Sequence, residues 1–525
     1  MASSETTAWV DGRVYTGRRK VEAVLVDDGR IVVAGSSEEI RRHRATGTTT
    51  RPLSRRVLIP GLVDSHCHVR SSVLMQNGVD LRSCRSVNDI VDQLREAALL
   101  HPTGPILGWG WDETGFPIAR YPMRDDLDQV SVNRPVIAYR RCLHVAAANS
   151  EALRAMRLLD GAVRDPPGGH LGRIGTGLDG LLYDDALSSL RPLESRSFAA
   201  LERELEHWLN EAAAHGLTTL VAMSADVDEL RTIQRVYQSA PSPVRVRAYV
   251  RPDQLGLLDS VPDLRTSEDL RVSGVKVFAD GALGARTAWL SEAYADAPGV
   301  RGECLIEPAG LSEVAREAAD RQLGIAVHAI GDRAVQQALR VFHAEPPFGT
   351  PRIEHASLTP PELLPEFAAV RPALVVQPSF LVSDTWIQQR LGPARARWAY
   401  AFRYLIGLGL HVAGSSDAPV EVLDPWVGMA AATAPRPGPS EVEKLTAAEA
   451  FSMYTHEAGA ALGEPEIGSL EAGAYADMVL IEARDWPAAL RRGAPGILAT
   501  YRSGRPVFER GPEPASPLLE RAQAL

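Results

Sequence analysis

The stretch VLIPGLVDSHCHV, residues 57–69, is the one around which the rest of the chain is organised. Its apolar run predicts a buried strand, and His66 and His68 stand where that strand ends. Residues two apart in a strand point to the same face, so the two imidazoles can bind one metal ion side by side. Because a His-x-His pair also arises by chance, the prediction depends on further ligands at the ends of later strands.

The composition is that of a large globular protein. The chain has 525 residues, 45% hydrophobic and 23% charged, which suits a big α/β barrel with a satellite domain. A formal net charge of −10 argues against a nucleic-acid partner. The four cysteines form no CxxC pair, so we expect free thiols rather than disulfides or a thiolate metal site. We expect no signal peptide and no membrane span, and therefore a cytoplasmic protein.

The middle of the chain alternates short apolar runs with amphipathic stretches such as 198–215 and 311–322. This alternation predicts parallel β/α units. Eight strand candidates follow one another along the chain, at 57–69, 217–224, 244–250, 274–278, 325–330, 352–355, 374–377 and 410–414. Eight is the number that closes a TIM (β/α)8 barrel, so the predicted fold class is α/β with that barrel at its centre.

Both ends of the chain carry hairpin signals around the barrel segment. Asp11-Gly12 and Asp28-Gly29 separate alternating runs near the start, and strand–turn–strand patterns recur after residue 468. We therefore predict one composite β-sandwich from residues 1–58 and 465–525, with the barrel at 59–464. About 145 residues separate the first two barrel strands, far more than a βα unit needs, which predicts an inserted α/β subdomain at 80–195 that covers the barrel mouth.

Polar residues stand at the ends of several predicted strands, where a TIM barrel places its active site. These candidate metal ligands are His66, His68, Lys276, His328, His355 and Asp417. Each alone has an ordinary explanation: a lysine can extend to solvent, a histidine can pack in the mouth, and an aspartate after two serines can cap a helix. Their joint occurrence at the ends of different strands favours a shared metal centre.

The residue types fit metal-assisted hydrolysis. Neutral imidazoles and carboxylates suit Zn²⁺ and similar divalent ions. Burial lowers the pKa of a lysine, and the resulting amine can react with CO₂ to give a carbamate whose two oxygens can bridge two ions. Asp417 could take a proton from a metal-activated water and deliver it to a leaving nitrogen, which makes it the candidate catalytic residue.

The ordered segments PGLVDSHCH, GVKVFADGALGARTA, AVHAIGDRA, RIEHA and GSSDAPV closely resemble the amidohydrolase superfamily. Within it they resemble the amidohydrolase 3 branch, which contains N-substituted formamide deformylases. The resemblance includes GWGWDE at 108–113, HVAAANSEAL at 144–153 and the closing GSLEAGAYADMVLIE, so it spans nearly the whole chain. These motifs are specific for the branch and poorly specific for the substrate.

The resemblance implies a role for each candidate ligand. His66 and His68 would bind the more buried metal together with Asp417. Lys276, if carboxylated, would bridge to a second metal held by the remaining two histidines, although the sequence leaves one ion and two ions equally open.

The resemblance also implies residues that contact the substrate. His144, Trp111 and Arg286 lie in family-like segments and are the candidates for this role. Asp64 is expected behind the direct ligands, and Cys67 is expected to point away from them because side chains alternate along a strand.

The leading hypothesis is hydrolysis of a C–N bond, in an amide or formamide, of a small molecule. A deaminase acting on a ring amidine is the first alternative, but its typical glutamate three residues after the fifth-strand histidine is replaced by Gly331. A catalytically silent barrel with a binding role is the second, and the presence of all six candidate ligands argues against it. We expect no nucleic-acid or membrane partner, and the sequence leaves open whether the chain forms a homodimer.

Overall fold

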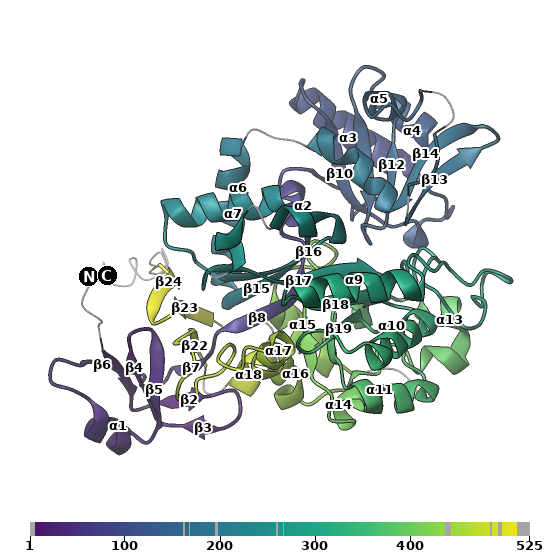
Figure 1. The fold of residues 1–525 in the computed structure, drawn as a ribbon. Helices are drawn as coiled ribbons and strands as arrows, with labels where there is room; N and C mark the ends of the chain where they lie inside the picture. Colours follow the sequence, from purple (N-terminus) through teal and green to yellow (C-terminus); the bar gives the residue numbers. More distant parts are fainter. Residues whose placement is uncertain are drawn as a thin grey trace, which may run out of the picture.

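The structure is a computed structural model that describes residues 6–160, 163–166, 168–194, 198–258, 261–265, 267–435, 443–483, 486–491 and 496–511. Its centre is an eight-stranded parallel sheet that curves into a barrel (Figure 1). The barrel strands are β8 (Leu62–Cys67), β15 (Leu217–Ala225), β16 (Arg245–Val250), β17 (Leu270–Phe278), β18 (Gly324–Ala329), β19 (Arg352–His355), β20 (Ala373–Val376) and β21 (Val412–Gly414). All eight predicted strands are present, which confirms the predicted fold class.

The barrel closes where its last strand meets its first. The order in the sheet runs from β21 to β8, and backbone hydrogen bonds join the ends of these two strands. The N–H of Asp417 donates to the carbonyl of His66 at 2.8 Å, and the N–H of His68 donates to the carbonyl of Ala418 at 2.7 Å. Closure therefore brings residues from opposite ends of the barrel segment together.

The predicted strand at 57–69 is in fact two strands. β7 (Val57–Pro60) pairs with strands outside the barrel, and only β8 enters it. Gly61 separates them, and a Cβ there would lie 2.2 Å from Oγ1 of Thr218. The prediction merged the two strands because no polar residue interrupts the apolar run between them.

Strands from both ends of the chain form a composite sandwich, as predicted. One sheet has the order β5-β4-β1-β6 and the other β24-β23-β22-β7-β2-β3. Their bounds are β1 (Thr7–Val10), β2 (Arg13–Tyr15), β3 (Lys20–Val21), β4 (Ala23–Asp27), β5 (Arg30–Gly35), β6 (Thr49–Pro52), β22 (Met478–Glu482), β23 (Gly496–Arg502) and β24 (Arg505–Glu509). Buried side chains such as Trp9, Leu58, Leu480 and Tyr501 form its core.

A separate six-stranded sheet lies between β8 and β15 in the sequence and above the barrel in Figure 1. Its order is β13-β14-β12-β11-β10-β9. The bounds are β9 (Val79–Asp80), β10 (Ile106–Trp111), β11 (Val136–Arg140), β12 (Val145–Ala148), β13 (Gly169–Ile174) and β14 (Gly177–Asp184). Helices α3 (Val87–Leu100), α4 (Arg124–Asp128) and α5 (Ser150–Ala155) belong to this segment, which we call the insert.

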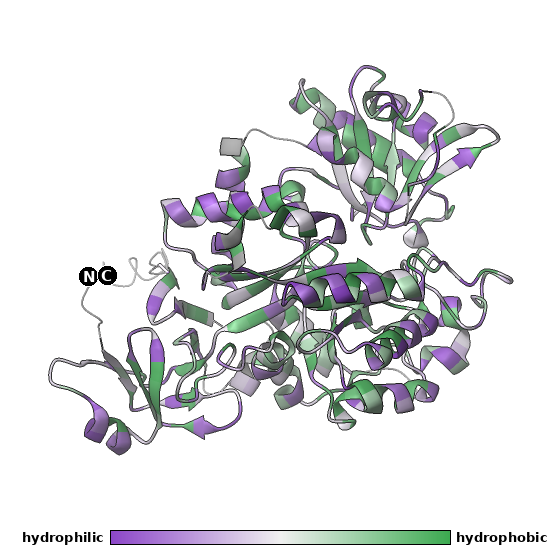
Figure 2. Ribbon diagram, viewed as in Figure 1, coloured by the Kyte–Doolittle hydropathy of each residue, from purple (hydrophilic) through white to green (hydrophobic). Residues whose placement is uncertain are grey.

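Helices surround the barrel with their apolar faces against the strands, and Figure 2 shows polar residues on their outer faces. The longer ones are α6 (Phe198–Ala214), α7 (Val227–Ser239), α9 (Pro308–Asp320), α10 (Asp332–Ala344), α13 (Ile387–Ala396) and α15 (Pro425–Thr433). The shorter ones are α2 (Val69–Met75), α8 (Leu255–Leu258), α11 (Leu364–Val370), α12 (Phe380–Ser383), α14 (Phe402–Gly407), α16 (Ala447–Met453), α17 (His456–Leu462) and α18 (Trp486–Arg491). Helix α1 (Ser37–His43) packs on the sandwich strands instead, where Ile40 joins an apolar cluster with Leu25. Among the described residues, none of these helices has the length and apolarity that crossing a bilayer requires.

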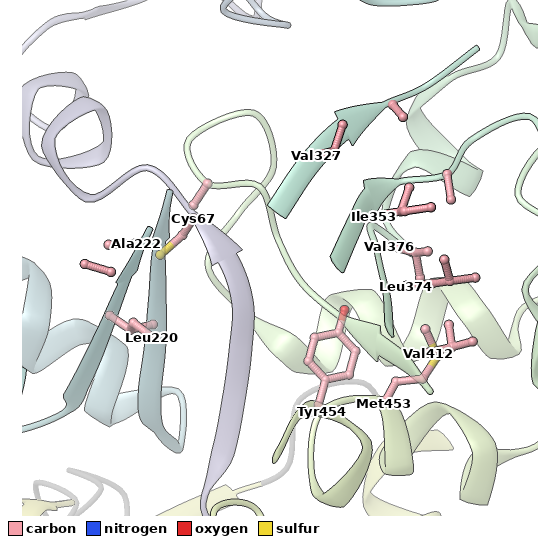
Figure 3. Packing of buried hydrophobic residues seen from close by; sticks show 14 of the residues in the cluster. Cys67, Leu220, Ala222, Val327, Ile353, Leu374, Val376, Val412, Met453 and Tyr454 are labelled. Carbon is pink, nitrogen blue, oxygen red and sulfur yellow. The ribbon is translucent and has the colours of Figure 1, made fainter. Parts of the chain in front are cut away.

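The largest apolar cluster packs the barrel strands against these helices, and Figure 3 shows part of it. Cys67 belongs to this cluster, and its thiol lies beside Leu220 and Ala222 of β15 (Figure 3). Its Sγ is 3.5 Å from the carbonyl of Val221. The thiol thus faces the packed side of the barrel wall, as the alternation of side chains predicts.

Candidate metal centre

Three of the predicted ligands meet where the barrel strands end. Donor atoms of His66, His355 and Asp417 lie within 4.8 Å of one another, and all three residues are buried. His68 lies next to them, since its Nε2 and that of His66 are each 3.2 Å from Oδ1 of Asp417. The prediction grouped His355 with His328, and the structure places the His355 ring 5.0 Å from His66 and 4.4 Å from His328.

Hydrogen bonds behind the imidazoles fix which nitrogen of each ring is available. Nδ1–H of His66 donates to Glu354 at 2.6 Å, and Nδ1–H of His355 donates to Gln377 at 2.8 Å. Both rings therefore keep Nε2 for the cluster. In His328 the roles of the two nitrogens are reversed. Its Nε2–H donates to the carbonyl of Gly281 at 3.1 Å, which leaves Nδ1 available. Outer hydrogen bonds of this kind are typical of metal-binding histidines.

The cluster contains buried polar atoms for which the described residues offer no hydrogen-bond partner. Nε2 of His66, Oδ1 of Asp417 and Nζ of Lys276 are buried and make no hydrogen bond. Such atoms are costly inside a protein unless a ligand pairs with them. Two imidazole nitrogens and a carboxylate oxygen form a donor set that suits a divalent cation, so these residues fit a metal ion.

Lys276 lies on β17 inside the barrel mouth and is 1% exposed. Its Nζ is 5.0 Å from the centroid of the Phe278 ring. Burial lowers the pKa of Lys276 to about 8, although the negative charges of Glu354 and Asp417 act in the opposite direction. A buried amine with a lowered pKa is the chemical requirement for the predicted carbamate.

The carboxylates of the site stay ionised despite their burial. Burial alone would raise the pKa of Glu354, but the guanidinium of Arg352 and the hydrogen bond from His66 bring it below its ordinary value. Burial would also raise the pKa of Asp417, and the imidazoles of His66 and His68 lower it well below that value. Burial itself lowers the pKa of His355 to about 3, which keeps this imidazole neutral and able to bind a metal.

Two of the clustered residues have left-handed backbones. His355 has φ +72° and Asp417 has φ +56°, a region that residues other than glycine rarely adopt. Each stands where a strand ends and the chain turns across the mouth. Strained conformations of this kind concentrate at functional sites.

A pocket with an empty volume of about 580 Å³, its open mouth included, leads to the cluster. Its lining includes His328, His355 and Asp417 from the barrel and His144 from the insert. Nδ1–H of His144 donates to Asp184 at 2.6 Å, and this carboxylate raises the pKa of His144 although burial acts to lower it.

Two other predicted substrate contacts lie elsewhere, because neither residue lines this pocket. Trp111 is 0% exposed within the core of the insert, and its Nε1–H donates to the carbonyl of Ala138 at 3.0 Å. Arg286 pairs with Asp296 at 2.9 Å. Their positions give no support to a direct contact with substrate.

Two further carboxylates support the site, and sequence reasoning missed the first of them. Glu354 was overlooked because it directly precedes His355 in RIEHA, and nothing in the sequence pairs it with His66. Asp280 is fully buried and accepts backbone N–H groups of Ile330 and Gly331 at 3.0 and 2.8 Å, which fixes the loop after His328. Burial raises the pKa of Asp280 to about 7. A carboxylate directly before a strand-end histidine is the signal that could have found Glu354.

Known proteins are similar to this chain over most of its length. A family model described as "Amidohydrolase family" matches residues 53–508. The putative amidohydrolase YtcJ of Bacillus subtilis is 31% identical over 496 residues, which cover 90% of this chain and 93% of YtcJ. The N-substituted formamide deformylase of Arthrobacter pascens is 24% identical over 524 residues, 93% of this chain and 95% of the deformylase.

A solved structure resembles most of the fold. It is that of an uncharacterized metal-dependent hydrolase from Pyrococcus horikoshii OT3, which superposes with a TM-score of 0.76 at 28% identity. The match covers 91% of this chain and 97% of the other.

Proposed function

Because this chain belongs to the amidohydrolase family, we propose that it is a metal-dependent hydrolase that cleaves a C–N bond of a small amide or formamide. Water adds to the carbonyl carbon, the C–N bond breaks, and the products are a carboxylic acid and an amine. The single observation that carries the proposal is the convergence of His66, His355 and Asp417, with buried donor atoms that lack partners.

The residues of the site divide the work as follows. His66, His68, His355 and Asp417 would hold a divalent ion, with Zn²⁺ first among the candidates, and Lys276 and His328 would hold a second ion if Lys276 is carboxylated. A bound ion supplies Lewis acidity toward a carbonyl oxygen and toward water.

Asp417 moves the proton. Its Oδ1 faces the imidazoles of His66 and His68, each 3.2 Å away, so Oδ2 is the atom that accepts a proton from water and donates it to the leaving nitrogen. Glu354 and Gln377 keep the imidazoles oriented through their Nδ1–H groups. His144 reaches the pocket from the insert and contacts the substrate.

The pocket mouth favours an uncharged substrate. Its two guanidinium groups already bind carboxylates: Arg140 pairs with Asp112 at 3.0 Å and with Glu113 at 2.8 Å, and Arg141 pairs with Glu421. The positive charge of each guanidinium is therefore already paired with a carboxylate of the chain. Apolar residues such as Leu283 and Trp386 line the same pocket and suit an apolar substituent on the nitrogen.

The test is a screen of Zn²⁺-loaded protein against N-formyl and N-acetyl amines, with an N-formyl amino acid of similar size as the anionic comparison. We expect turnover of the uncharged amides and little of the anionic one. Release of ammonia from a ring amidine, with no amide cleaved, would favour the deaminase alternative. Protein that binds no metal and turns over nothing would favour the silent barrel.

Replacing the proposed proton carrier gives a sharper prediction. Asp417→Asn should lower kcat on the order of 10²–10⁴-fold, the usual contribution of a general acid–base. Circular dichroism should show a retained fold, with metal content measured in parallel. Asp228→Asn removes the same charge from a side chain that is 79% exposed and should leave kcat unchanged. Wild-type kcat in Asp417→Asn would refute the assignment.

A further inference from the structure

The turn between β11 and β12 carries His144 to the barrel mouth. Leu143, just before it, has a left-handed φ of +57°, which helps the chain reverse within residues 141–144. The His144 ring lies 5.0 Å from that of His328 and 6.0 Å from that of Phe278. A residue of the insert is thus held against two residues of the barrel, beside the metal candidates.

Asp184 holds this histidine from behind. It is the last residue of β14, and its carboxylate accepts Nδ1–H of His144 at 2.6 Å. Its backbone N–H also donates to the carbonyl of His144 at 2.9 Å, so main chain and side chain both join the two residues. The Asp184 side chain is 6% exposed, which shields the hydrogen bond from competing water.

The backbone of Asp184 departs from the strand it ends. Its φ is +49°, a left-handed conformation that disfavours most residues with a side chain. The strand pairing continues up to this residue, with Gly169 opposite Asp184. The turn therefore directs the carboxylate at His144 rather than along the strand, and neighbouring Asp185 is left exposed.

We propose that Asp184 is a positioning residue, which holds the His144 imidazole with Nδ1 toward the insert and Nε2 toward the pocket, where Nε2 contacts the substrate oxygen. An imidazole without this partner can turn about its terminal torsion, which is broad, and exchange its two nitrogens. The proposal rests on the proposed function for the identity of the substrate oxygen. The orientation of the ring does not depend on it.

The kinetic test compares two adjacent carboxylates. Asp184→Ala should lower kcat/KM by about 10–100-fold, the range typical of outer-shell hydrogen-bond partners. Asp184→Asn keeps an oxygen that accepts Nδ1–H and should retain most of the activity, which also covers the case in which the alanine variant folds poorly. Asp185→Ala removes the neighbouring charge and should resemble wild type.

A double-mutant cycle separates positioning from general stability. In a His144→Ala background, Asp184→Ala should cause almost no further loss, since the residue acts through the missing imidazole. Additive losses of kcat/KM, or equal damage from Asp185→Ala, would overturn the proposal.

A spectroscopic measurement keeps the proposal testable if no amide is hydrolysed. A proton held in a short hydrogen bond between imidazole and carboxylate gives a low-field NMR resonance, which can be recorded without substrate. The resonance that disappears in His144→Ala should also disappear in Asp184→Ala and persist in Asp185→Ala. If this pattern holds while all amides fail as substrates, the proposed function is wrong and the positioning stands. A resonance of His144 that persists in Asp184→Ala would overturn the positioning itself.

Discussion

Lys276 is the residue on which the proposal of a second metal ion depends. Its Nζ is buried on the wall of the site and has no hydrogen-bond partner among the residues that the structure describes. An unpaired ammonium in such a place is unfavourable, whereas a carbamate would carry negative charge toward bound cations. Carboxylation, if it occurs, would therefore give this lysine a stabilised form that the free amine lacks.

Removing the lysine should lower the metal content. Lys276→Ala is expected to reduce bound metal from two ions toward one, measured by elemental analysis against protein concentration. Bicarbonate together with a short-chain acid should partly restore activity, because a small carboxylate can occupy the space of the carbamate. Lys444→Ala, elsewhere in the chain, is the matched control. Unchanged metal content in Lys276→Ala would refute the bridging role.

Glu229 is a buried carboxyl outside the metal cluster. It lies on α7, is 8% exposed, and accepts the backbone N–H of Arg70 at 3.3 Å. Burial, followed by the negative charge of Asp226, raises its pKa from 4.5 to about 8. The folded state therefore binds a proton between these two pH values that the unfolded state has lost.

The sign of the resulting pH dependence follows from that proton. As pH rises from about 4.5 to 8, Glu229 should lower the free energy of unfolding by up to about 1.4 kcal/mol per pH unit. Glu229→Gln cannot ionise, so its advantage over wild type should grow across this range. Urea unfolding of chelator-treated protein at several pH values measures the difference. A constant difference between variant and wild type would contradict the raised pKa.

At the level of elements, the chain passes from the sandwich into the barrel between β7 and β8. Gly61 allows the chain to leave one sheet and enter the other with no side chain between β8 and β15. A Cβ at this position would lie 2.2 Å from Oγ1 and 2.5 Å from Cγ2 of Thr218. Both atoms belong to the strand that pairs with the one carrying His66.

Adding that Cβ should strain the first barrel pair. Gly61→Ala is expected to lower the free energy of unfolding by about 1–3 kcal/mol, the usual cost of overpacking. Thr218→Ala in the same chain should recover part of the loss. Gly407→Ala, where nothing lies within 4 Å of the new Cβ, should be neutral or slightly stabilising. Chemical denaturation measures all three, and equal stability of Gly61→Ala and wild type would show that the strands adjust freely.

The insert shows where prediction from sequence reached its limit. Trp109 and Trp111 are two apart, and simple alternation places them on one face of a strand. A register shift falls between them, with Gly110 at φ +98°. Trp109 consequently stacks on Tyr139 at 4.1 Å, while Trp111 packs in the other core of the insert. The prediction that Trp111 contacts the substrate assumed a regular strand and did not include this bulge, although Gly110 marks its position in the sequence.

At the scale of the whole molecule, the barrel could be predicted because its strands are apolar runs bounded by turn residues. Parallel strands end at one rim of the barrel. The proximity of the polar residues at those ends could therefore be predicted without knowing the register of the strands. The residues that hydrogen-bond to the candidate metal ligands could not be predicted in this way. Glu354 and His66 are 288 residues apart, and only the closed barrel shows that they hydrogen-bond.

The same convergence predicts how metal binding should affect stability. His66, His355 and Asp417 come from the first strand, a middle strand and the loop after the last strand, and they meet only when the barrel is closed. An ion bound by all three stabilises the folded state and has no matching site in the unfolded chain. At a free ion concentration of 100 Kd, such binding contributes about 2.7 kcal/mol. Chelation should therefore lower the Tm by several degrees, and Zn²⁺ should restore it. In Asp417→Asn the shift on chelation should be much smaller, because one of the three donors is lost, whereas Asp228→Asn should respond like wild type. Differential scanning calorimetry with and without chelator measures these shifts in Tm. If wild-type protein prepared with metal has the same Tm with and without chelator, the three residues do not bind the ion together.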